Sequence, residues 1–361
     1  MASGLASTIR LTRPIYISAL KISKRDKNIE RGHQMKAIVQ SEYGSADVLS
    51  LEELEKPVVA DNEVLVRVRS AGVHAGDWHL MRGDPFLIRL ISGGVLKPKI
   101  TTIGTDMAGQ VETVGKDVTQ FQPGDEVFGD LSECGFGAFS EYVAVPENAL
   151  AHKPANLSFE ESATVPVSGL AALQALRDYG EIQPGQRVLI NGASGGVGSF
   201  AVQLAKGFGA EVTAVCSTSK IAMVKSLGAD TVVDYRQSDP TKPTQPYDLI
   251  VDAAAYRPFS DFLDALAPGG TYVMVGGATS EFFRSMLLGS FTERFKDKAS
   301  RRHVKCLVST PNQADLTVLK DWIKAGKLKP FVDRTYPLAE VATAIRYVEE
   351  RHVKGKVAIS V

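Results

Sequence analysis

The chain has 361 residues, of which 44% are apolar and 23% charged, a composition typical of a soluble globular protein with about two domains. Lysine plus arginine and aspartate plus glutamate both number 41, so no overall charge favours a nucleic-acid partner. The three cysteines, Cys134, Cys216 and Cys306, form no CxxC pair, which excludes a disulfide framework and a cysteine-rich structural zinc lobe. With no apolar run of about 18 residues, we expect no transmembrane helix, and a reducing compartment fits best.

The first 34 residues have a composition of their own. They hold seven basic side chains against two acidic ones, and no acid precedes Asp26. Serine, threonine and arginine without acids are typical of a transit peptide to a mitochondrion or plastid. A non-native extension is the alternative, because Met35 opens a strand-like segment that would make a natural start for a cytoplasmic protein. In both interpretations the segment carries no chemistry, and we exclude it from the fold.

From residue 36 to about 156 the chain is rich in short predicted strands. Apolar and charged residues alternate from Val64 to Val68, which is the period of a half-buried strand. Further strands are expected over 107–115, 125–130 and 138–147, separated by turn residues such as those at 122–125. Short strands joined by glycine and proline turns predict a small barrel-like β domain.

After a helix that ends at Gly180, the pattern changes to apolar strands alternating with helices. Strands are predicted over 186–193, 211–217, 231–235, 247–255, 271–277 and 304–310, and helices over 195–209, 221–229, 259–270 and 314–326. Near-continuously apolar strands separated by helices predict a parallel, doubly wound sheet in an α/β fold. A strand, a helix and a final strand follow in 331–361.

A glycine-rich turn between one predicted strand and the next helix indicates a phosphate-binding loop. It comprises Ala193, Ser194, Gly195, Gly196, Val197 and Gly198. Glycines let the backbone approach a pyrophosphate, which then lies at the helix N-terminus. Ala193 occupies the first glycine position of the dinucleotide-binding pattern, so a glycine turn without a ligand is the alternative. The strand–loop–helix–strand context favours the dinucleotide.

The end of the next strand favours NADPH over NADH. An NAD-preferring site places an acid there to bind the ribose 2′-hydroxyl, but none occurs between Glu211 and Asp230. Ser217, Thr218 and Lys220 offer hydroxyls and an ammonium instead, which suit a 2′-phosphate. Tyr235, after the third strand, is a further candidate for this pocket, and a plain surface turn is the alternative reading of its surroundings.

Together these motifs resemble the medium-chain dehydrogenase/reductase superfamily, in its zinc-free quinone oxidoreductase and enone reductase branch. The resemblance rests on 191–206, on 226–236 and on 336–359, and extends from Met35 to the end of the chain. It implies a GroES-like catalytic domain (35–155 completed by 311–361) around a Rossmann nucleotide domain (156–310). It also implies a homodimer, and it places Gly276 and Gly277 beside the nicotinamide.

The resemblance also bears on zinc. Relatives that bind zinc carry cysteine, histidine and cysteine ligands in three segments, where this chain has His74, Thr105 and the segment 165–168. One imidazole cannot hold a catalytic zinc, which needs three protein ligands. We therefore expect no metal. Without this Lewis acid, quinones and α,β-unsaturated carbonyls are the accessible substrates, because conjugation already makes a carbon electrophilic.

By the same resemblance the candidate catalytic residues are His74, Asp77 and Arg82. His74 stands where relatives usually have asparagine, and it either contacts the nicotinamide ribose, donates a proton or makes a structural hydrogen bond. Arg82 matches an arginine frequent in the family, and an ion pair with an acid is its alternative role. An inert thiol is expected for Cys134, although it could line the cleft.

Other interpretations remain open. The segment 86–99 is long and apolar and carries basic residues, which fits a lid, a partner contact or a peripheral membrane contact. The leading function is a zinc-independent, NADPH-dependent reductase of a small quinone or enone. An NADP-linked alcohol dehydrogenase and a catalytically idle NADPH-binding partner or sensor protein are the alternatives, because fold alone does not set function.

Overall fold

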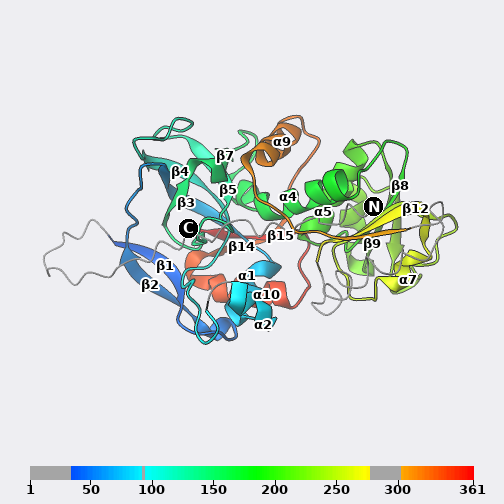
Figure 1. The fold of residues 1–361 in the computed structure, drawn as a ribbon, viewed down its shortest axis with the longest axis horizontal. Coiled ribbons are helices and arrows are strands. Elements are labelled where there is room, and N and C mark those ends of the chain that lie inside the picture. Colours follow the sequence, from blue (N-terminus) through cyan, green and yellow to red (C-terminus); the bar gives the residue numbers. More distant parts are fainter. Residues whose placement is uncertain (1–33, 92–93, 277–301) are drawn as a thin grey trace, which may run out of the picture.

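A computed structural model describes residues 34–91, 94–276 and 302–361. Gly277 and all of the leader except Gln34, which begins β1, therefore lie outside the described residues. Two large sheets occupy opposite ends of the long axis (Figure 1), and a separate antiparallel hairpin is formed by β1 (Gln34–Gln40) and β2 (Leu49–Glu55). The mixed α/β class predicted from the sequence is confirmed.

The first sheet is parallel and has six strands in the order β10-β9-β8-β11-β12-β13. Its strands lie within one continuous part of the chain, and helices stand between β8 and β9, between β9 and β10, and between β11 and β12. The strands are β8 (Arg187–Asn191), β9 (Glu211–Cys216), β10 (Thr231–Asp234), β11 (Tyr247–Asp252), β12 (Leu266–Met274) and β13 (His303–Cys306), and the helices among them are α5 (Gly196–Gly207), α6 (Ile221–Ser226) and α7 (Ser260–Leu263). The predicted doubly wound Rossmann sheet is confirmed, because the strand order reverses between β8 and β11.

The second sheet has seven strands and combines both ends of the described chain. Its order is β14-β15-β3-β4-β5-β7, and β6 pairs with β3. The last strand lies antiparallel to β3, with Val357 opposite Val73. The strands are β3 (Glu63–Val73), β4 (Asp106–Val114), β5 (Glu126–Asp130), β6 (Tyr142–Pro146), β7 (Leu150–His152), β14 (Val332–Pro337) and β15 (Lys356–Ser360). This is the predicted GroES-like β-rich unit.

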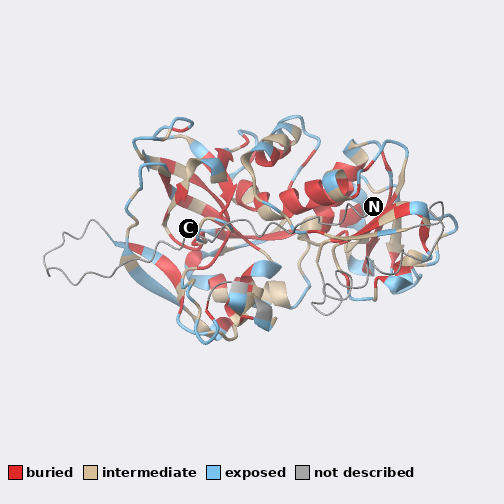
Figure 2. Cartoon of the chain, viewed as in Figure 1, coloured by how far each residue is buried: buried red, intermediate tan, exposed pale blue. Residues whose placement is uncertain are grey.

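Helices lie against the two sheets and bury their own apolar faces there. Figure 2 shows buried residues concentrated in both sheets and in α4 (Pro166–Gln174) and α5, and one apolar cluster joins α4, α5 and the parallel strands. A second cluster fills the β-rich unit and includes residues of α1 and α10. The remaining helices are α1 (Ala75–Arg82), α2 (Phe86–Ile91), α3 (Phe159–Ala163), α9 (Gln313–Lys324) and α10 (Val341–Glu349), and a π-helical turn covers Ala175–Tyr179.

One predicted helix is much shorter than expected. The expected helix over 259–270 is only the four-residue α7, and β12 begins at Leu266, inside the predicted helix. Pro268 lacks a backbone donor and Gly269 adopts a φ of +80°, so this stretch cannot continue a helix. Leu266 instead pairs with Tyr247 of the neighbouring strand β11, and Phe259 and Phe262 belong to the same apolar cluster as these two residues.

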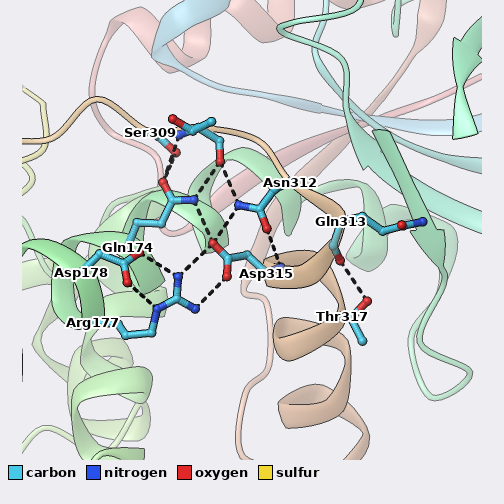
Figure 3. A network of polar contacts seen from close by, with 9 residues as sticks. Gln174, Arg177, Asp178, Ser309, Asn312, Gln313, Asp315 and Thr317 are labelled. Atoms are coloured by element: carbon cyan, nitrogen blue, oxygen red, sulfur yellow. Dashed lines mark hydrogen bonds and ion pairs between the residues drawn. The ribbon is translucent and has the colours of Figure 1, made fainter. Parts of the chain in front are cut away.

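A polar network fixes the return of the chain from the parallel sheet to the β-rich unit (Figure 3). The Gln174 side chain donates to the carbonyl of Thr310 at 2.8 Å and to the carboxylate of Asp315 at 3.0 Å. The Arg177 guanidinium holds both oxygens of the same carboxylate, at 2.7 and 3.1 Å. These contacts hold the start of α9 against α4, and with it Ser309, which lines the cleft described below.

Candidate functional site

A cleft of about 640 Å³ lies between the two sheets. On one side it is lined by the end of β3 and by α1, and on the other by the loops that follow β8, β11 and β12. These loops leave the carboxyl ends of the parallel strands where the strand order reverses, which is where open α/β sheets bind their ligands. The cleft therefore joins both halves of the molecule at the position that the sheet topology favours.

The predicted phosphate loop lines this cleft. Ser194, Gly195, Gly196, Val197 and Gly198 face it, whereas Ala193 is fully buried behind them. Helix α5 begins after Gly195 without a side-chain cap, so the amides of its first turn keep their donors for an anion. A Cβ added at Gly198 would lie 2.2 Å from the carbonyl oxygen of Gly192, so only glycine allows this tight turn. The loop fits a diphosphate.

Two cationic side chains gather at another part of the cleft. Lys220 lines it, and its ammonium donates to the carbonyl of Val353 at 2.8 Å. Burial lowers the pKa of Lys220. Arg351 also lines the cleft, with its guanidinium 4.4 Å from the centre of the Tyr256 ring. Sequence reasoning missed Arg351 and Tyr256, which come from opposite halves of the fold and carry no local motif.

The other residues predicted for the 2′-phosphate lie differently. Ser217 is buried at the end of β9, and Tyr235 is half exposed and away from the cleft lining. The Thr218 hydroxyl donates to the carboxylate of Asp234 at 2.6 Å. Asp234 lies on the neighbouring strand β10, opposite Cys216 of β9. The sequence prediction missed it because it considered only the residues that follow β9.

Hydrogen bonds to Asp234 bear on its charge. It also accepts from the amide of Arg236 at 3.0 Å and from the side chain of Gln237 at 2.9 Å. The hydrogen bond from Thr218 lowers its pKa most, so the carboxylate stays ionised but its oxygens are engaged. Asp234 is thus an acid beside the predicted pocket that does not line the cleft.

His74 caps α1 at the wall of the cleft. Its Nδ1 accepts from the amide of Gly76 at 2.9 Å, so the ring proton lies on Nε2, which donates to the hydroxyl of Thr105. Burial lowers the pKa of His74 to about 4, and the imidazole is neutral near pH 7. A Cβ at position 76 would lie 2.6 Å from the His74 ring, which explains why this position is a glycine.

Asp77 completes this cap from within the first turn of the helix. Its Oδ2 accepts from the amide of His74 at 2.8 Å. Its Oδ1 is buried and has no hydrogen-bond partner among the described residues, and burial raises its pKa. The third predicted residue, Arg82, does not line the cleft. It pairs with Glu349 of α10 at 2.5 Å and so ties α1 to that helix.

A buried ion pair lies beside the phosphate loop. The ammonium of Lys356 is 2.9 Å from the carboxylate of Asp106, and both residues are at most 2% exposed. Lys356 lines the cleft. A Cβ added at Gly196 would lie 3.0 Å from the Cδ of Lys356, so this side chain packs closely on the phosphate loop. The amide of Gly355 donates to the carbonyl of Ser194 at 2.8 Å. The last strand thus holds the phosphate loop from the opposite half of the fold, a role that sequence reasoning missed.

A second buried acid lies opposite Asp106 in the sheet. Asp130 on β5 is its register partner, and burial raises the pKa of Asp130 to about 7. Cys134, near this strand, packs against the apolar cluster of the β-rich unit and does not line the cleft. Burial raises its pKa to about 12, so the thiol is protonated.

The three segments that carry zinc ligands in relatives do come together. His74 and Thr105 share a hydrogen bond, and Ser168 lines the same cleft. Over residues 34–91, 94–276 and 302–361, no three histidine, cysteine or acidic side chains gather as a metal site would require. In the same part of the chain, no helix combines the length and apolar character needed to cross a membrane.

Two family models match the chain. One describes an alcohol dehydrogenase GroES-like domain and covers residues 60–155, and the other describes a zinc-binding dehydrogenase and covers residues 227–359. Between them they span more than half of the sequence. The chain belongs to the medium-chain dehydrogenase/reductase superfamily. This confirms the family predicted from the sequence.

Relatives place the chain in the quinone oxidoreductase-like branch of this superfamily. It is 33% identical to the mitochondrial NAD(P)H oxidoreductase RTN4IP1 of Bos taurus over 360 residues, covering 92% of this chain and 90% of the relative. It is 32% identical to a 2-methylene-furan-3-one reductase of Solanum lycopersicum, covering 98% and 86%. The solved quinone oxidoreductase of Coxiella burnetii superposes with a TM-score of 0.79 at 29% identity, covering 91% and 99%.

The relative from Bos taurus is named an NAD(P)H oxidoreductase, and the cleft of this chain fits a nicotinamide cofactor. The phosphate loop offers uncapped amides for a diphosphate, and Lys220 and Arg351 offer cations. Gly276, which follows β12 and is predicted to lie beside the nicotinamide, lines the cleft.

Proposed function

We propose that this protein is a zinc-independent, NADPH-dependent oxidoreductase of quinones or α,β-unsaturated carbonyls. The observation that carries the proposal is one cleft in which the phosphate loop, two cations and the neutral His74 meet between the two sheets. The names of the relatives, an NAD(P)H oxidoreductase, a quinone oxidoreductase and an enone reductase, support the same activity.

The residues of the chain divide the work of binding and orientation. When bound, the dinucleotide supplies the hydride. The first turn of α5 holds the diphosphate, and Lys356 keeps that turn in place from the other half of the fold. Trp78 and His79, whose rings stack at 3.6 Å, form an aromatic wall for a planar unsaturated substrate. His74 keeps its proton on Nε2, bound to Thr105, and holds the wall of the cleft in place.

The chemistry of His74 also supports independence from zinc. A histidine ligand must offer a bare nitrogen, but Nδ1 of His74 is engaged with a backbone amide and Nε2 carries the proton. The neighbouring hydroxyl of Thr105 is a poor zinc ligand beside histidine and cysteine. An NADP-linked alcohol dehydrogenase, which needs that metal, is therefore the weaker alternative.

Preference for NADPH rests on Lys220 and Arg351. A 2′-phosphate would receive charge-assisted hydrogen bonds from both, each contributing about 1.5–3 kcal/mol. The nearest acid, Asp234, has its oxygens engaged and lies off the cleft lining, so it does not offer the carboxylate that selects NADH.

The test follows the absorbance of NADPH, and separately of NADH, with 9,10-phenanthrenequinone and a panel of small enals, with and without a chelator. We expect chelator-insensitive oxidation that prefers NADPH. Lys220→Gln should raise the KM for NADPH by about tenfold or more and change the KM for NADH less than about twofold. Lys225→Gln, an exposed lysine on α6, is the matched control and should change neither.

Each other outcome contradicts a defined part of the proposal. A strong preference for NADH refutes the assignment of the cations. Activity that a chelator abolishes favours the alcohol dehydrogenase. NADPH binding without turnover of any quinone or enal favours an idle binding protein or sensor.

The same family membership supports three further proposals. The catalytic domain comprises 35–155 and 311–361 and surrounds a nucleotide domain of 156–310. The chain forms a homodimer, as the resemblance to the family implies. Residues 1–34 direct the protein to an organelle, a mitochondrion or plastid, in keeping with their composition and with the mitochondrial relative.

A further inference from the structure

An exposed apolar ridge borders the cleft. It consists of Phe86 and Leu90 on α2 and of Val95 and Leu96 on the turn that follows, all of them exposed. These four are among only nine large hydrophobic side chains exposed in the described part of the chain. The ridge begins two residues after Asp84, which lines the cleft.

The ridge is a fixed feature of the fold. The Tyr43 hydroxyl donates to the carbonyl of Gly94 at 2.6 Å, and the Arg89 guanidinium donates to the carbonyl of Gly83 at 2.9 Å and lies over the Tyr43 ring. A Cβ at Gly94 would lie 2.0 Å from the carbonyl oxygen of Lys97, so the turn is tight. It presents Leu96 to solvent with 89% of the residue exposed.

Charge identifies the partner. Arg89 and the exposed Lys97 and Lys99 accompany the ridge, and no acidic residue occurs from 85 to 105. Apolar side chains that project from a protein surface can insert into the hydrocarbon of a bilayer, and cations beside them can contact the phosphates of anionic lipids. A protein partner would need an apolar pocket with acidic residues around it to receive these side chains, whereas a bilayer can receive any apolar side chains that project from the surface.

We propose that this ridge docks the protein on the surface of an anionic lipid bilayer, with Leu96 inserted and Lys97 and Lys99 against the phosphates. The docked cleft would then open beside the membrane. The inference does not depend on the proposed activity, because binding to lipid is measured without any substrate.

The experiment measures co-sedimentation of the full chain with vesicles of phosphatidylcholine alone and of phosphatidylcholine mixed with phosphatidylglycerol. We expect binding to the anionic vesicles that weakens with salt. Lys97→Gln/Lys99→Gln should lower the partition coefficient roughly 25-fold, since each surface cation contributes about 1 kcal/mol. Leu96→Asp should abolish the part of the binding that the ridge contributes.

Matched variants exclude general effects of charge. Val58→Asp places the same acid at a valine that is 91% exposed in the connection between β2 and β3, and it should bind like the wild type. Lys324→Gln/Lys327→Gln removes two exposed lysines at the end of α9 and should have little effect. Because every variant keeps the basic leader, its contribution to binding is the same throughout. Thermal melts confirm that each variant is folded.

Three results would overturn the proposal. The first is no binding of the wild type to either vesicle. The second is an equal loss in each variant and its matched control, which would make the effect one of net charge. The third is a change of oligomeric state in Leu96→Asp that accounts for its loss of vesicle binding, which would assign the ridge to contact between protein chains.

Discussion

Removing Lys356 tests how the last strand supports the phosphate loop. In Lys356→Met the carboxylate of Asp106 loses the ammonium at 2.9 Å and keeps only the amide of Val167, which donates at 2.7 Å. Both residues are buried, and breaking such a pair leaves a buried charge without its partner, which costs about 3–5 kcal/mol. Urea unfolding at pH 7 measures this loss. Lys116→Met, at an exposed pair with Asp61, should cost at most about 1 kcal/mol.

The pH dependence of the same variant has a defined sign. Burial raises the pKa of Asp106 and Lys356 lowers it, so the variant carboxyl has a still higher pKa. The folded variant then takes up a proton more readily than the unfolded chain as the pH falls, so its stability deficit narrows on acidification. Asp106→Asn/Lys356→Met should recover part of the loss. A deficit below about 1 kcal/mol at pH 7, or one that widens on acidification, would refute the buried pair as described.

Three further outcomes are expected. Gly198→Ala should weaken NADPH binding at least about tenfold in a fluorescence titration because its Cβ would lie 2.2 Å from the Gly192 carbonyl, whereas Gly195→Ala, with 3.4 Å to the same oxygen, should bind within a few-fold of the wild type. The pKa of His74 is about 4 in the folded state against 6.5 in the unfolded chain, so the free energy of unfolding of the wild type should fall by about 3 kcal/mol as the pH falls from 6.5 to 4. His74→Asn keeps the helix cap and has no imidazole to protonate, so unfolding measured over the same pH range should show a smaller loss. Arg82→Gln should change kcat/KM with phenanthrenequinone less than about twofold, because its partner is Glu349 and not the cleft; a tenfold loss would return it to the catalytic set.

The alternation of strands and helices was readable from the sequence because each parallel strand is covered on both faces. Such strands appear as continuous apolar runs, and the runs that contain Ile190, Val215 and Val251 all became central strands. The prediction failed over 259–270, where apolar spacing suggested a helix. There the backbone limits of Pro268 and Gly269 prevent a longer helix, and a strand begins at Leu266 instead.

The candidate site was predictable only where it is local. The phosphate loop is one continuous stretch with its own glycines, and it lines the cleft as expected. Arg351, Lys356 and Tyr256 reach the same cleft from distant parts of the chain, and only the tertiary fold brings them there. Asp234 shows the same limit over a shorter distance, because pairing of β9 with β10 sets it beside Thr218.

The place of β15 in the second sheet has a consequence for how the protein is made. The parallel sheet uses a continuous stretch of chain and can form while synthesis proceeds, whereas β15 pairs with β3 across nearly the whole chain, Val357 opposite Val73. Such distant pairing is slow and comes last. Gly355 and Lys356 hold the phosphate loop and its neighbour Asp106, so a chain in which β15 has not yet paired would have its nucleotide sheet without a finished cleft. Pairing of β15 with β3 is therefore the step that completes the site, and a chain without Gly355 and Lys356 would lack it.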